Sequence, residues 1–85
     1  MQIYEAIKQI RTELGLTQVT FAQKLHVSFS TVNRWENGRV KPNRLATIMI
    51  ISLAEETEVN NDAVSLLKST VEGVLLLCKK NLLLN

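Results

Sequence analysis

The chain is 85 residues long and 46% hydrophobic, which is room for one compact domain and too apolar for a disordered chain. Its single cysteine, Cys78, excludes an internal disulfide, and one cysteine with one histidine excludes a zinc site with four ligands from this chain. No leader peptide and no membrane span are evident, so we expect a soluble, cytoplasmic protein.

The net charge of +2 is divided unevenly along the chain. Residues 1–50 contain seven basic and three acidic side chains, a net charge of +4, whereas residues 51–85 contain three basic and five acidic side chains, a net charge of −2. A basic half favours a polyanionic partner. A solvated helix face with a few extra lysines produces the same imbalance, so the charge alone does not decide.

The first predicted helix covers residues 3–14. Its apolar side chains recur at the spacing of one helix face, with polar residues between them: Ile3, Ile7, Ile10 and Leu14. Gly15 follows and is expected to end the helix in the left-handed conformation that glycine adopts at low cost.

Two short helices are predicted next, between residues 17 and 38. Thr17 can cap the first of them and Ser28 the second, and the pair Asn37-Gly38 closes the second. Ala22 is small enough to let the two helices cross closely. The apolar side chains of both helices are expected to form an inner face, with Trp35 in the core: Phe21, Leu25, Val27, Val32 and Trp35.

The remaining chain reads as a loop and two further helices. Pro42 disfavours helix at Lys41, and Asn43 can cap a helix from Arg44 to about Glu56. That helix has a wide apolar face: Leu45, Ile48, Met49, Ile51 and Leu53. After a polar break, a last helix runs from about residue 62 towards residue 80, with an apolar stripe at helical spacing: Val64, Leu67, Val71, Val74 and Cys78.

The third predicted helix has a polar outer face. On a helical wheel four side chains fall within about 100° of one another and away from Val32 and Trp35: Ser30, Asn33, Arg34 and Asn37. This face has several hydrogen-bond donors and acceptors but one full charge, which suits the reading of base edges better than simple phosphate binding.

The stretch RTELGLTQVTFAQKLHVSFSTVNRWENGRVKP resembles the helix-turn-helix DNA-binding domain of the phage-repressor and Cro type, also called the xenobiotic-response-element family. The resemblance lies in LGLTQ, FAxxL, VSxxTVxRWExG and the proline that follows, and it extends over about residues 3–56. It implies an all-α, five-helix lambda-repressor-like fold, with the helix-turn-helix formed by the second and third helices.

The resemblance also implies roles for single residues. Ser30 and Arg34 match base-reading positions, Phe29 often touches bases in the family, and Asn33 shares their outer face. Phe29 equally fits a cover over the seam between the first and third helices. Phosphate contacts are expected from Arg11, Gln18, Thr31, Asn37, Lys41 and Arg44. Arg11 and Glu36 match a pair that forms a structural ion pair between the first and third helices.

His26 departs from the family pattern, which usually has glycine in the turn between the second and third helices. The backbone there tends to need a positive φ, which costs about 1 kcal/mol or more for a residue with a Cβ atom, although histidine tolerates it better than most. No carboxylate, serine or cysteine constellation lies nearby in sequence. We therefore expect an exposed turn residue and no catalytic or metal-binding role.

The predicted organisation is a DNA-binding domain over residues 1–58 and a leucine-rich C-terminal helix over residues 59–85. That helix either packs only on its own chain or also joins two chains into a homodimer through residues 62–84, because its leucines lie on several faces. No cofactor, membrane or small-molecule ligand is indicated.

The predicted function is a sequence-specific, double-stranded DNA-binding transcriptional regulator, a repressor of bacterial or phage origin. Two alternatives stay open: an antitoxin-like or other protein-interaction module, and the DNA-targeting fragment of a larger enzyme. The chain is not expected to be an enzyme by itself, because no nucleophile, paired carboxylates or metal cluster stands out.

Overall fold

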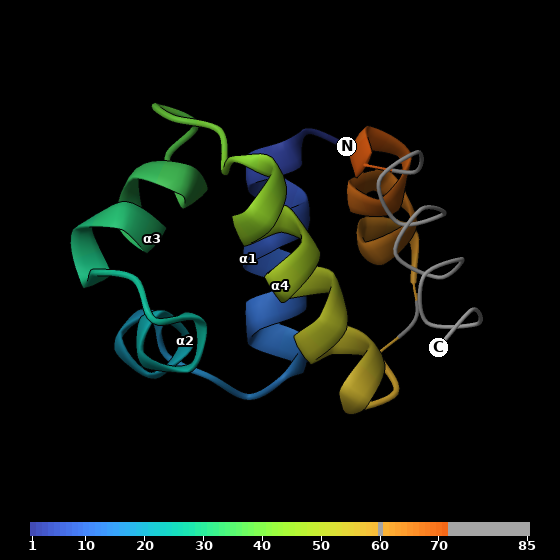
Figure 1. Cartoon of the computed structure of the whole chain (residues 1–85), viewed down its shortest axis with the longest axis horizontal. Helices are drawn as coiled ribbons and strands as arrows, with labels where there is room; N and C mark the ends of the chain where they lie inside the picture. Colours follow the sequence, from blue (N-terminus) through green and yellow to red (C-terminus); the bar gives the residue numbers. More distant parts are fainter. Residues whose placement is uncertain (60, 72–85) are drawn as a thin grey trace, which may run out of the picture.

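The computed structural model describes residues 1–59 and 61–71 (Figure 1). The helices are α1 (Ile3–Glu13), α2 (Gln18–Leu25), α3 (Phe29–Glu36) and α4 (Arg44–Glu56), and residues 62–71 are also helical. No strand occurs in these parts of the chain. The predicted all-α fold with five helices is confirmed, whereas the predicted course of the last helix beyond residue 71, with Val74 and Cys78, lies outside the described residues.

Three helices begin at the side chains that the sequence predicts as caps. Each cap oxygen accepts a hydrogen bond from the backbone amide three residues later, at 3.1 Å for Thr17, 3.1 Å for Ser28 and 2.8 Å for Asn43. A cap of this kind is typically worth about 1 kcal/mol relative to alanine. The starts of α2, α3 and α4 are therefore fixed by local chemistry.

Left-handed residues lie one or two positions after each of the first three helices. Gly15 (φ +72°) and Gly38 (φ +73°) adopt this conformation at low cost. His26 adopts it as well, with φ 59° and ψ 39°, as the comparison with the family pattern predicts. Glu58, after α4, is a further non-glycine residue with positive φ (62°), and the sequence did not predict it.

The core lies where all five helical segments meet. In Figure 1, α1 and α4 lie in the middle, with α2 and α3 on one side and residues 62–71 on the other. Every segment contributes side chains that are fully or almost fully buried, among them Ile7, Ile10, Phe21, Val32, Ile50, Ile51, Val64 and Leu67. Trp35, only 4% exposed, is a core residue as predicted.

Two predictions about apolar faces have different outcomes. Val64, Leu67 and Val71 are buried against their own chain, so this part of the C-terminal stripe is used within one molecule. Leu45, by contrast, was predicted on the apolar face of α4 but is 67% exposed. It lies in the first turn of α4, next to the loop, where it projects beyond the core.

Candidate nucleic-acid interface

An ion pair joins α1 to α3. The Nε atom of Arg11 donates to Oε2 of Glu36 at 2.6 Å, and Nη2 donates to Oε1 at 2.9 Å, which makes the contact bidentate. The side chains are only 13% and 3% exposed. The hydrogen bond to Glu36 raises the pKa of Arg11 above its ordinary value against the opposing effect of burial. The pair is thus a permanent, shielded link between two helices.

Three amide side chains extend this link along α2 and α3. Nε2 of Gln18 donates to Oε1 of Glu36 at 3.0 Å, and Nδ2 of Asn33 donates to Oε1 of Gln18 at 3.3 Å. Nδ2 of Asn37 donates to Oδ1 of Asn33 at 3.0 Å. We call the five connected residues, Arg11, Glu36, Gln18, Asn33 and Asn37, the polar network.

The polar network brings together residues that the sequence assigns to different roles. Gln18, Asn33 and Asn37 were predicted as separate DNA contacts, and the structure places them in one hydrogen-bonded row. Asn33 and Gln18 are half-buried, whereas Asn37 is exposed. Each amide nitrogen retains one hydrogen that is not used in these contacts, so the row can still donate to an external acceptor.

The hydroxyl groups at the start of α3 form a second cluster. Oγ of Ser28 lies 2.7 Å from Oγ1 of Thr31 and 3.2 Å from Oγ of Ser30. Ser30 is exposed and Phe29 is 49% exposed. About half of Phe29 is therefore accessible to a partner, as a base contact would require.

The turn between α2 and α3 fixes the position of the two helices, and of their polar side chains, relative to each other. The turn consists of residues 26–28, and the backbone N–H of Val27 reaches back to the carbonyl of Ala22 at 3.0 Å. Ala22 is only 2% exposed, which fits the close crossing predicted for a small residue at this position. The left-handed conformation of His26 lets the chain reverse here, and its side chain remains exposed.

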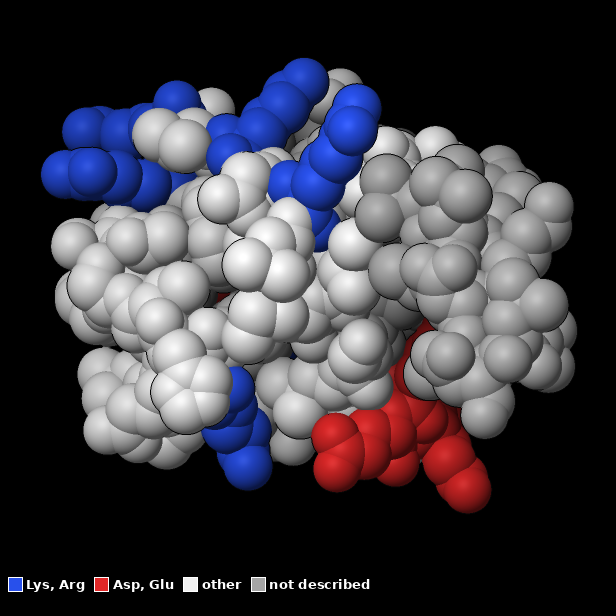
Figure 2. Space-filling view, in the orientation of Figure 1, with Lys and Arg blue, Asp and Glu red and all other residues white. Residues whose placement is uncertain are grey.

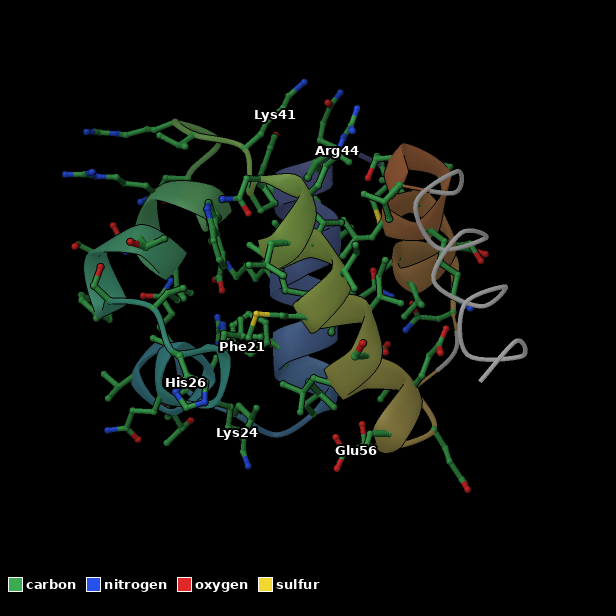
Figure 3. All side chains as sticks on the ribbon, in the orientation of Figure 1. Phe21, Lys24, His26, Lys41, Arg44 and Glu56 are labelled. Carbon is green, nitrogen blue, oxygen red and sulfur yellow. The ribbon has the colours of Figure 1, made fainter. Side chains whose placement is uncertain are left out.

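Basic side chains gather along one edge of the molecule in Figure 2, and acidic ones lie at another. Figure 3 places Lys41 and Arg44 at the first edge and Glu56 near the second. Arg34, in the last turn of α3, is exposed, and so is Arg39 in the following loop. Arg39 was not among the predicted site residues. Its signal in the sequence is its place in the basic loop, directly after Gly38.

Metal ligands and membrane spans are two further features to consider in the described residues. No group of three or more His, Cys, Asp or Glu side chains is arranged there as metal ligands would be. None of the helices in residues 1–59 and 61–71 has the length and apolarity needed to cross a membrane.

Comparisons with known proteins place the chain in a family. The family model described as helix-turn-helix matches residues 7–60, which is more than half of the chain. Over 43 residues the chain is 40% identical to the HTH-type transcriptional activator BcrR of Enterococcus faecalis; the alignment covers 51% of this chain and 21% of that protein. The chain therefore spans about a fifth of the length of this relative. No solved structure matches the chain.

Proposed function

The chain belongs to the helix-turn-helix family and has an all-α, lambda-repressor-like fold; on this premise we propose that it is a DNA-binding transcription regulator whose α3 enters the major groove of double-stranded DNA and reads a specific sequence there. The observation that carries the proposal is the exposed face of α3. It presents Ser30, Arg34 and half of Phe29 next to a basic edge.

Base reading is assigned to Phe29, Ser30, Asn33 and Arg34. Arg34 can donate two parallel hydrogen bonds to a guanine, and the ring of Phe29 can contact a thymine methyl group. Asn33 contributes its remaining N–H group, since its other polar atoms are bound within the polar network. The half-buried position of Asn33 restricts it to a base edge that approaches α3 closely.

Phosphate binding is assigned to Arg11, Gln18, Thr31, Asn37, Lys41 and Arg44. Gln18 is the first residue of α2, whose N-terminal amides point at the same anion. Lys41 and Arg44 are exposed and flank the start of α4. Arg11 uses three of its five N–H groups for Glu36 and the carbonyl of Leu16 and has two left for a phosphate.

Repression is proposed as the regulatory outcome. A bound domain within a promoter excludes other proteins from the same DNA by occupancy. The same domain bound upstream of a promoter could recruit instead, and the relative from Enterococcus faecalis is called an activator. The position of the selected DNA sites relative to promoters decides between the two outcomes.

A homodimer is proposed for binding to palindromic sites, with the two copies of α3 about 34 Å apart, one turn of DNA. Because Val64, Leu67 and Val71 are buried within one chain, the contact must use other side chains of residues 62–84. Analytical ultracentrifugation at tens of micromolar should show a dimer. A monomer at this concentration, together with selected sites that lack two-fold symmetry, would remove this part of the proposal.

Selection from a pool of random double-stranded DNA, followed by gel-shift titration of the selected site, tests the reading role. Arg34→Ala and Ser30→Ala should weaken binding to that site, while Lys24→Ala should not, because Lys24 lies away from Lys41 and Arg44 in Figure 3. If both α3 variants bind like the wild type and only Gln18→Ala is weakened, α3 is not the reading helix.

A further inference from the structure

A groove with a volume of about 580 Å³ lies between the end of α2, α3 and the first turns of α4. Its walls are mainly apolar and include Val27, Trp35 and Met49. Leu45 (67% exposed) and Val40 (51% exposed) also line it, so two large apolar side chains are accessible there. The volume lies within the range of about 300–1,000 Å³ that is usual for small-molecule sites.

The polar side chains of the groove are basic or neutral. Lys41 is an exposed cation, and among the described residues no aspartate or glutamate lines the groove. Figure 3 shows His26 beside α2 and Lys41 near the start of α4, well apart in this view. Asn43 and Thr31 are neutral, and their side-chain oxygens already form hydrogen bonds at helix starts, with the backbone of Ala46 and with Ser28. Lys41 is therefore the group best suited to hold a charged ligand.

We propose that this groove binds a small organic anion with a flat apolar body. The body packs on Val40, Leu45 and Met49, beside the nearly buried Trp35, and the acid group faces Lys41. The apolar walls supply most of the affinity, and the single cation orients the ligand, which is the usual division of roles in such sites.

The charges argue against a second copy of the chain as the occupant. A two-fold contact through this groove would place Lys41 and the neighbouring Arg44 of both copies in one interface. Both are exposed, and like charges across an interface are unfavourable. An anion carries the opposite charge, so its contact with Lys41 and Arg44 is favourable.

Because of the position of the groove, a bound ligand would affect the affinity for DNA. Lys41 and Thr31 line the groove and are also proposed phosphate contacts. A ligand acid group on Lys41 would compete with a phosphate for the same cation. This consequence rests on the proposed function, whereas binding of the ligand itself does not.

Two probes of nearly equal shape test the proposal on the full chain without DNA: indole-3-acetate, which is an anion, and indole-3-acetamide, which is neutral. In ¹H–¹⁵N spectra, indole-3-acetate should shift the Trp35 indole N–H and backbone amides of residues 25–27 and 45–49. A Kd of about 1 mM or lower is expected for a ligand of this size. The acetamide should bind about two- to fivefold more weakly, the usual range for one exposed ion pair.

Two lysine variants separate the groove from a general attraction of anions. Lys41→Gln should reduce the affinity for indole-3-acetate to that for the acetamide, whereas Lys24→Gln, which removes an exposed lysine outside the groove, should leave it unchanged. Three results would overturn the proposal. The first is shifts that are absent, or spread over the whole molecule, at a probe concentration tenfold above the expected Kd of about 1 mM. The others are equal affinities of the wild type for both probes, or shifts of the same amides when only the protein concentration changes. The last would identify a second copy as the occupant.

Discussion

Glu36 is the residue on which the polar network depends, and its replacement by glutamine should destabilise the domain strongly. Its carboxylate accepts two hydrogen bonds from Arg11 and one from Gln18, and its side chain is only 3% exposed. Glutamine has nearly the same shape but offers one acceptor oxygen and an NH₂ group. At least one of the three donors then faces another donor instead of an acceptor.

The expected loss follows from these contacts. Hydrogen bonds to a charged group are worth about 1.5–3 kcal/mol each, and a buried donor without a partner costs about 1–3 kcal/mol. Arg11 is 13% exposed and keeps its bond to the carbonyl of Leu16, so part of the penalty is relieved by water and by that contact. We expect Glu36→Gln to lower the free energy of unfolding by about 2–4 kcal/mol. For a domain of this size that lowers the Tm by about 8–30 °C.

Urea denaturation followed by circular dichroism measures this loss. Glu56→Gln is the matched control, because Glu56 is exposed at the end of α4 and its replacement should change stability by no more than about 0.5 kcal/mol. The double variant with Arg11→Met should be clearly more stable than the sum of the single changes predicts. A Glu36→Gln variant within about 0.5 kcal/mol of the wild type would show that the network does not hold α1 and α3 together.

The pH dependence of the ion pair follows from the sign of the pKa shift. Glu36 raises the pKa of Arg11 in the folded state above that of the unfolded chain. The corresponding stability is fully present below the unfolded pKa and is lost only as the pH rises through the higher folded value. The effect of Arg11→Met on the free energy of unfolding should therefore be constant between about pH 7 and pH 10.

Three further predictions concern binding and turns. Arg34→Ala should weaken binding to a selected site by about 1–3 kcal/mol in gel shifts and leave non-specific binding almost unchanged; equal losses on both kinds of DNA would indicate a phosphate contact. His26→Gly should raise the free energy of unfolding by up to about 1 kcal/mol with DNA binding intact, because φ is 59° there, and a loss in urea denaturation would reveal a contact of the imidazole. Gly38→Ala should lower the free energy of unfolding more than Gly15→Ala in the same assay. A Cβ atom at Gly38 would lie 3.2 Å from the ring of Tyr4, whereas a Cβ atom at Gly15 would have no other atom within 4 Å. Equal losses would show that the Tyr4 ring shifts freely.

The fold could be predicted largely because its boundaries depend on local chemistry. The caps at Thr17, Ser28 and Asn43 bond to amides three residues away, so the sequence alone contains both partners. The exposure of Leu45 could not be read in this way. An apolar residue in the first turn of a helix fits a helical stripe whether or not the core extends that far, and only the packing of α4 against its neighbours decides it.

Apart from the Arg11–Glu36 pair that the family resemblance implies, the candidate site was predicted as a set of residues but not as an arrangement. The contacts of Gln18 with Asn33 and Glu36 join residues 15 and 18 positions apart, and no periodicity indicates which amide meets which carboxylate. The groove beside Trp35 escaped prediction for the same reason: its lining comes from α2, α3, the following loop and α4. Side chains that each look ordinary in sequence form a cavity only when four segments meet.

The polar network also determines how variants of this surface should be interpreted. Glu36 is buried and holds Gln18, which in turn holds Asn33, so a change at Glu36 alters stability and the position of proposed DNA contacts together. Arg34 is exposed at the end of α3, so its replacement should alter affinity with little effect on folding. Measuring stability and affinity for both variants therefore separates recognition from positioning. A replacement that lowers affinity at unchanged stability marks a direct DNA contact, and a loss confined to the selected site marks a base-reading one.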